Sequence, residues 1–192
     1  MNRVLIVDDE ASVLKALRRV LTIVPCTYDG RTYRLDLDLA GSPGEALEKL
    51  KDHAYDLILS DYRMPGMDGV AFLKRARELQ PDAARMILSG YADLASVVAA
   101  INEAQIVRFL AKPWNDYELV SAIAQALAYR ALQVENRRLA DLVRLQQGKL
   151  TPEDYERRRL EEEEPGITRV NWGPDGSILL DEDLARELEG RV

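Results

Sequence analysis

The sequence predicts an α/β fold with a doubly wound, five-stranded parallel sheet, and two observations support that prediction. Short, continuous apolar runs ending in polar residues recur through the first two-thirds of the chain, as expected for strands buried on both faces. Amphipathic segments with helical periodicity separate these runs. Strands that alternate with helices favour a parallel sheet with helices on both sides.

The expected strands cover residues 4–9, 33–40, 56–61, 85–89 and 107–112. The second run alternates apolar and acidic residues, which is typical of a half-exposed edge strand, whereas the first and third are apolar until they end in acids. This difference favours the flavodoxin-like strand order 2-1-3-4-5. The helices are expected at residues 13–21, 42–51, 69–78 and 93–104, with a fifth beginning near residue 115.

The connection between the first helix and the second strand, residues 23–33, is longer than such connections usually are. Asp29-Gly30 lies within it between residues that favour strands, a signal for a hairpin with a type I′ turn. We therefore expect a small hairpin at the sheet edge.

The fifth helix is expected to continue to Gly148, because no proline or glycine interrupts this segment. A heptad register describes it, with Asn136 at an a position, and asparagine there fixes register in parallel dimers. The seam residues are Tyr129, Asn136, Val143 and Leu150 at a, and Leu132, Leu139 and Gln146 at d. Two readings stay open: a parallel dimeric coiled coil, or a single helix packed on its own chain.

Thr151-Pro152-Glu153 has the features of a helix start, and the charged helix to about residue 164 is expected to be a solvated linker. We expect Glu153–Arg157 and Asp154–Arg158 ion pairs on it. A hairpin is predicted at 167–180, with Trp172, Ile178 and Leu180 as docking anchors. The predicted division is an α/β domain at 1–128, a helical extension at 129–150 and a tail at 151–192.

The composition excludes several classes of protein. One cysteine, Cys26, rules out an intrachain disulfide and a cysteine-rich zinc site, and one histidine, His53, rules out a histidine-rich metal centre. The net charge of −7 argues weakly against non-specific binding to nucleic acid. No apolar run is long enough to span a bilayer and no signal peptide is evident, so a cytoplasmic protein is expected.

Polar residues stand where the predicted strands end. Asp8 and Asp9 end the first strand, Asp61 the third and Ser89 the fourth. Lys112-Pro113 end the fifth strand. Ligands of doubly wound sheets bind at these carboxyl ends, so the side chains are expected to converge. Clustered carboxylates repel each other unless a hard cation such as Mg²⁺ intervenes, and a lysine with a hydroxyl group suits a phosphoryl group.

The chain resembles the receiver domains of two-component response regulators (CheY-like) over about residues 1–128. The motifs that carry the resemblance are VDDE (7–10), LSDYRMPGMDG (59–69), LSGY (88–91) and FLAKP (109–113). The C-terminal extension resembles no output domain.

The resemblance implies a role for each matching residue. Asp61 would be the phosphoacceptor, taking its phosphoryl group from a sensor histidine kinase or a phosphotransfer protein. Asp9, Asp61 and the backbone carbonyl of Arg63 would bind Mg²⁺ directly, and Asp8 would act largely through water.

The resemblance also implies that Lys112 and Ser89 contact the phosphoryl oxygens. Phe109 occupies the position of an aromatic switch, whose ring would turn inward as Ser89 moves toward the phosphate. The neighbouring surface would then be remodelled.

Two kinds of output remain open. The first is a switch that acts by homodimerisation or by contacts of the helical extension with an unknown target protein. The second is a transcriptional regulator with an atypical DNA-binding tail, suggested by Arg130, Arg137, Arg138, Arg144 and Lys149. No enzyme motif occurs in the tail, so only self-phosphorylation and dephosphorylation chemistry is expected.

Overall fold

The computed structural model describes residues 1–90 and 104–163. Its main sheet is parallel throughout, in the order β4-β1-β5-β6-β7. In chain order the strands are β1 (Asn2–Val7), β4 (Leu35–Ala40), β5 (Leu57–Asp61), β6 (Ala84–Gly90) and β7 (Arg108–Lys112). The predicted strands and their order 2-1-3-4-5 are confirmed.

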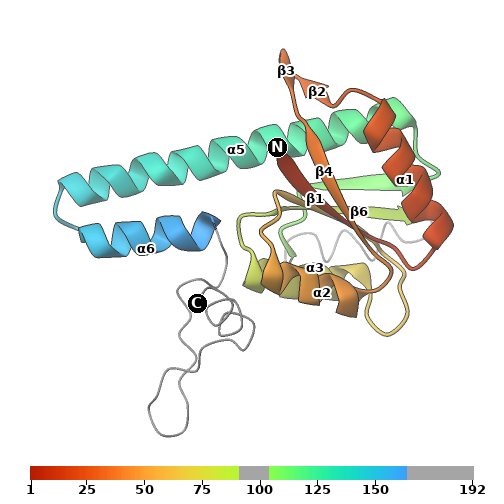
Figure 1. Cartoon of the computed structure of the whole chain (residues 1–192), viewed down its shortest axis with the longest axis horizontal. Helices are drawn as coiled ribbons and strands as arrows, with labels where there is room; N and C mark the ends of the chain where they lie inside the picture. Colours follow the sequence, from red (N-terminus) through yellow and green to blue (C-terminus); the bar gives the residue numbers. More distant parts are fainter. Residues whose placement is uncertain (91–103, 164–192) are drawn as a thin grey trace, which may run out of the picture.

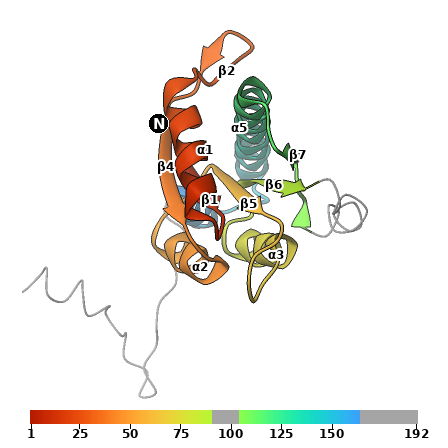
Figure 2. The same ribbon diagram turned by 90° about the vertical axis from the view of Figure 1, so that its right-hand side faces the viewer.

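Two helical layers cover the sheet (Figures 1 and 2). Helices α1 (Ala11–Ile23) and α5 (Asp116–Gln146) lie on one face, and α2 (Pro43–Asp52) and α3 (Gly69–Leu79) on the other. Strand β1 shows how the sequence directs this: Val4 and Ile6 belong to the α1–α5 core, whereas Leu5 and Val7 belong to the opposite core. Side chains of a strand alternate between faces, so a continuous apolar run supplies both cores at once.

Capping side chains mark the first residues of helices α2, α3 and α5. The Ser42 hydroxyl accepts the Glu45 N–H before α2, and Asp68 accepts the Ala71 N–H before α3. Asn115 accepts two N–H groups of the first turn of α5. These contacts satisfy donors that a helix start leaves unpaired. The hairpin expected at 167–180 lies outside the described residues, and so does the helix expected at 93–104 except for its last residue, Ala104.

The hairpin predicted between the first helix and the edge strand is present as β2 (Thr27–Tyr28) and β3 (Arg31–Thr32). Asp29 and Gly30 both have positive φ, as a type I′ turn requires. The hairpin is not an extra strand of the main sheet: it forms its own two-stranded sheet, and β2 packs against α5.

Helix α5 runs without a break from the receiver-like body into the extension (Figure 1). After it, α6 (Pro152–Glu163) folds back along α5. The expected solvated linker therefore has a docking face: Arg158 bonds Asp141 of α5 at 3.1 and 3.2 Å, and Asp141 is only 4% exposed. The expected Glu153–Arg157 and Asp154–Arg158 pairs do not form, since Arg157 pairs with Asp154 instead.

Within residues 1–90 and 104–163, no helix combines the length and the apolar character that crossing a membrane demands.

Candidate functional site

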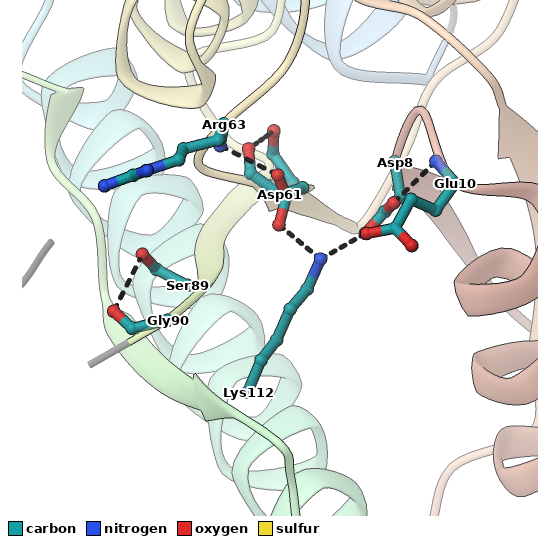
Figure 3. Close-up of polar contacts among 8 residues, drawn as sticks. Asp8, Glu10, Asp61, Arg63, Ser89, Gly90 and Lys112 are labelled. Atoms are coloured by element: carbon teal, nitrogen blue, oxygen red, sulfur yellow. Dashed lines mark hydrogen bonds and ion pairs between the residues drawn. The ribbon is translucent and has the colours of Figure 1, made fainter. Parts of the chain in front are cut away.

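The polar residues predicted to converge lie at the carboxyl end of the sheet, on four neighbouring strands. Asp8 follows β1, Asp61 ends β5 and Ser89 lies near the end of β6, while Lys112 ends β7. The register pairs Asp61 with Leu88, and Ser89 and Gly90 with Ala111 and Lys112, so Asp61, Ser89 and Lys112 lie on three successive rows at the same edge of the sheet. Figure 3 shows the Lys112 side chain extending between Asp8 and Asp61.

Lys112 joins the two buried acids. Its ammonium nitrogen donates to Asp8 Oδ2 at 2.7 Å and forms an ion pair with Asp61 Oδ1. Asp8 is 1% exposed and Asp61 is 6% exposed. Charges in such positions are costly unless they are paired, so the lysine offsets most of the repulsion between the two carboxylates.

The backbone holds the Asp61 carboxylate from the other side. The Arg63 N–H donates to Asp61 Oδ2 at 2.7 Å, which leaves Oδ1 directed at Lys112. The Asp8 carboxylate is held in the same way, because the Glu10 N–H donates to Asp8 Oδ1 at 2.9 Å. Each acid therefore has one oxygen fixed by its own loop and one shared with the lysine.

The electrostatics of the site follow from burial and pairing. Desolvation raises the pKa of Asp61, and the nearby Asp8 charge adds to that effect, while Lys112 and the Arg63 N–H oppose it. Burial lowers the pKa of Lys112, but its contacts with Asp61 and Asp8 outweigh burial, and the net shift is upward. The lysine therefore remains charged at neutral pH.

Ser89 and Phe109 lie on the β7 side of the site. The Ser89 side chain is buried, and its hydroxyl donates to the Gly90 carbonyl at 3.4 Å, a long contact (Figure 3). Phe109 is partly buried and packs against the core on the α2–α3 face. The predicted switch pair thus occupies neighbouring strands, and Ile87 is the residue paired with Phe109.

The residues present fit a divalent cation. Asp9 follows the buried Asp8 in the chain and is exposed, so its carboxylate is accessible from solvent. The carboxylates of Asp8 and Asp61 against one ammonium group leave an excess of negative charge, and carboxylate and carbonyl oxygens are the donors that Mg²⁺ prefers. In residues 1–90 and 104–163, no group of three or more His, Cys, Asp or Glu side chains has the geometry to hold a metal. A cation here would therefore need the Arg63 carbonyl and water as further ligands.

The site also depends on Gly69 and Ser60, to which the sequence motifs assign no individual role. The Gly69 N–H donates to the Tyr62 carbonyl at 2.8 Å, and a Cβ atom on Gly69 would meet the Asp61 carbonyl oxygen at 2.0 Å. The Ser60 hydroxyl donates to the same carbonyl at 2.8 Å. The signal in the sequence was the glycine directly after the α3 capping residue Asp68, where a residue with a side chain is normally preferred.

Comparisons with known proteins agree with this geometry. Residues 4–124 match the response regulator receiver domain family. The hydrogenase transcriptional regulatory protein HoxA of Bradyrhizobium diazoefficiens is 40% identical over 134 residues, 69% of this chain and 25% of that protein. The chain thus spans about a quarter of the length of the curated relatives it matches.

Solved structures give the same result. The signal receiver domain of an HD domain-containing protein from Pseudomonas fluorescens Pf-5 superposes with a TM-score of 0.62 at 34% identity, covering 70% of this chain and 92% of that one. A CheY-like receiver domain protein from Methanospirillum hungatei has a TM-score of 0.60 at 27% identity, covering 69% of this chain and 98% of that one. With its sheet order and the acid–lysine site at the strand ends, the chain belongs to the response regulator receiver domain family.

Proposed function

We propose that Asp61 is the phosphoacceptor of this receiver, taking a phosphoryl group from a sensor histidine kinase or a phosphotransfer protein in a Mg²⁺-dependent reaction. The observation that carries the proposal is the Lys112 ion pair with Asp61, at the end of a buried strand and beside Asp8. An ordinary surface aspartate has no such surroundings. The protein would act in the cytoplasm, where such phosphodonors are found.

Each residue has a task in the transfer. Asp61 Oδ1, the oxygen not fixed by the Arg63 N–H, would attack phosphorus as the phosphorus–nitrogen bond of the donor's phosphohistidine breaks and its imidazole leaves. Lys112 would neutralise charge on the phosphoryl oxygens. Mg²⁺, bound by Asp9, Asp61 and the Arg63 carbonyl, would supply further charge neutralisation, with Asp8 acting through water. These contacts position the group and stabilise charge, which is most of what phosphoryl transfer requires.

Ser89 and Phe109 would convert the new phosphate into a change of surface. The contact of the Ser89 hydroxyl with the Gly90 carbonyl is long, at 3.4 Å, so giving up this contact to approach a phosphoryl oxygen would cost little. Phe109 on the adjoining strand is partly buried, and its ring would fill the space that Ser89 leaves.

Output through α5 is supported by the exposed seam, meaning the predicted a and d residues from Tyr129 to Val143. Leu132 is 64% exposed and Leu139 is 51% exposed in the single chain, although both are large and apolar. Charged residues of this segment lie at the b, c and f positions, except Glu135 at g. A seam that is uncharged, and apolar except for Asn136, favours a parallel homodimer over a helix packed on its own chain.

A transcriptional role is the second candidate, and the relatives' names are what favour it, since HoxA is a transcriptional regulatory protein. The basic residues of the extension argue against direct DNA contact by α5 and α6. Arg130, Arg137 and Arg144 form ion pairs with acids of the same chain. Of the α6 arginines, Arg158 pairs with Asp141 and Arg159 with Glu156.

The first experiment is the light-scattering mass of wild type and Asp61→Asn, each with Mg²⁺ and with or without beryllofluoride. Beryllofluoride stands in for the phosphoryl group on Asp61. A change of mass in wild type alone would support both the phosphoacceptor and the dimer as output. A dimer in every condition would be consistent with the seam as the dimer interface, but the output would then have to be a surface change other than dimerisation. A constant monomer would contradict the homodimer.

A separate test addresses the phosphoacceptor itself. Wild type should incorporate radiolabelled phosphoryl from a phosphorylated histidine kinase with Mg²⁺, and should lose that labelling with EDTA. Asp61→Asn should remain unlabelled while its far-ultraviolet circular dichroism matches wild type. Labelling of Asp61→Asn to the wild-type level would overturn the assignment.

A further inference from the structure

Three arginines spaced by seven residues line the side of α5 that lies away from the exposed seam. Arg130, Arg137 and Arg144 fall on nearly the same face, because seven residues are close to two helical turns. Each contacts an aspartate: Arg130 pairs with Asp56, Arg137 with Asp82, and Arg144 with Asp141. We call Arg130 and Arg137, which reach outside the helix, the α5 clamp.

Arg130 and Arg137 contact residues that lie just before the amino-terminal ends of β5 and β6, the strands that carry Asp61 and Ser89. Arg130 Nη1 lies 2.6 Å from Asp56 Oδ1, and Arg130 Nε donates to the Asp82 carbonyl at 3.0 Å. Asp56 directly precedes β5, which ends in Asp61. Asp82 lies two residues before β6, which carries Ser89. Both strands that carry the phosphoacceptor and the switch hydroxyl are therefore tied to α5 at their opposite ends.

The anchor points of the clamp are themselves held in place. The second oxygen of Asp56 accepts the Arg3 N–H at 2.8 Å, and the Asp56 carbonyl accepts the Ala84 N–H at 2.9 Å. Arg130 and Asp56 are both mostly buried, so this pair is screened less by solvent than a surface pair. A well-fixed anchor limits rotation of α5 about its own axis.

Helix α6 reinforces the same side of α5. Asp141, one turn beyond the clamp, accepts hydrogen bonds from Arg144 at 2.8 Å and from Arg158 of α6 at 3.1 and 3.2 Å. Desolvation raises the pKa of Asp141, but the two arginines outweigh it and the net shift is downward. The clamp and α6 together occupy one side of α5 and leave the seam open on the other.

We propose that the α5 clamp is the device that couples the phosphorylation site to the orientation of the output helix. It fixes α5 to β5 and β6, so that a change at Asp61 and Ser89 is carried along these strands to Arg130 and Arg137. The coupling part of this inference rests on the proposed function of Asp61. Arg130 and Arg137 are positioning residues: they act through the strands, about 16 Å from the site along β5.

The first test measures the orientation of α5 without any phosphoryl analogue. Spin labels are placed on the exposed residues Lys51 and Gln147, as Lys51→Cys and Gln147→Cys in a Cys26→Ala background, and the chain is diluted with unlabelled protein. Electron–electron double resonance should give one narrow distance distribution. Arg130→Ala with Arg137→Ala should widen it at least twofold, while Arg138→Ala, on the same helix, should leave it unchanged.

Charge reversal separates the clamp from general damage to the helix. Arg137→Asp should widen the distribution, and adding Asp82→Arg should narrow it again, because the ion pair is restored in the opposite sense. A distribution as narrow as wild type in the double alanine variant would overturn the clamp. Failure of the reversed pair to narrow it would overturn the ion pair as the cause.

The second test measures coupling to the site. Linkage is reciprocal, so removing Arg130 must change the affinity of beryllofluoride for Asp61 if the clamp senses that site. We expect Arg130→Ala to shift the apparent dissociation constant by about fivefold or more, and Arg138→Ala to leave it unchanged. Equal affinities in wild type and Arg130→Ala would overturn the coupling. If wild type bound no beryllofluoride, the phosphoacceptor would fail instead, and the spin-label result would still stand.

Discussion

Gly69 lies so close to Asp61 that a Cβ atom in its place would stand 2.0 Å from the Asp61 carbonyl oxygen. That carbonyl also accepts the Ser60 hydroxyl, so it cannot move freely away from the intruding methyl group. We expect Gly69→Ala to lower the free energy of unfolding by about 1 to 3 kcal/mol, the usual cost of overpacking. Since Asp61 would be displaced from Lys112, phosphoryl labelling should fall as well. Urea unfolding and labelling rates would measure the two effects.

Gly44→Ala is the matched control, because Gly44 lies in the first turn of α2 with its nearest neighbour, Ser42 Oγ, at 4.0 Å from an added Cβ atom. The added methyl group of Gly44→Ala should leave the free energy of unfolding unchanged or raise it slightly. Equal stability of wild type and Gly69→Ala would show that the Asp61 backbone gives way without cost.

The two acids that follow β1 should behave differently when each is changed to asparagine. Asp8 is buried and bonded to Lys112, so Asp8→Asn should lower stability without any metal, by about 1 to 3 kcal/mol. Asp9 is exposed, so Asp9→Asn should leave that stability unchanged and weaken Mg²⁺ binding at least tenfold. Calorimetric Mg²⁺ titration and urea unfolding with EDTA would separate the roles. A Mg²⁺ affinity unchanged in Asp9→Asn would remove Asp9 from the metal site.

The contrast between Asp8 and Gly69 shows which parts of the site could be predicted. The sequence placed Asp8, Asp61, Ser89 and Lys112 together because parallel strands bring their carboxyl ends to one edge. The sequence alone could not predict the short distance between Gly69 and Asp61, because that distance depends on how α3 packs against β5.

The helical extension shows the same limit. The length of α5 and the hairpin turn followed from local sequence signals, and both are confirmed. The ion-pair partner of Arg158 did not follow from local signals. Local spacing favoured Asp154, whereas in the folded chain Arg158 pairs with the buried Asp141. Asp82 likewise meets Arg137 across 55 residues of sequence, and no local pattern encodes such a contact.

The seam on α5 should decide the mass of the protein in solution. Leu139→Glu puts a charge on a residue at the centre of the seam, which the proposed homodimer would bury, so it should shift light-scattering mass to that of one chain. Leu160→Glu is the control, because Leu160 is also exposed and apolar but lies on α6, outside the seam. A dimer that persists in Leu139→Glu would place the interface elsewhere.

Because the Cys26 thiol is buried, the stability of the protein should fall as pH rises in the alkaline range. Desolvation raises the pKa of Cys26 from 9.0 to about 11, and its thiol lies against the Val120 carbonyl between the hairpin and α5. The folded state therefore keeps its proton at a pH where the unfolded state has released it. The contribution of the protonated Cys26 thiol to the free energy of unfolding is fully present below pH 9 and is lost as pH rises through about 11.

The size of that loss is about 1 to 3 kcal/mol, from two pKa units at about 1.4 kcal/mol each. Urea unfolding of wild type and Cys26→Ala between pH 8 and 11 would measure it, because the difference between the two proteins cancels the tyrosines and lysines that titrate in the same range. The advantage of wild type over Cys26→Ala should shrink as pH rises. A constant difference across that range would mean that the thiolate is accommodated in the folded state, with water reaching the space between β2 and α5.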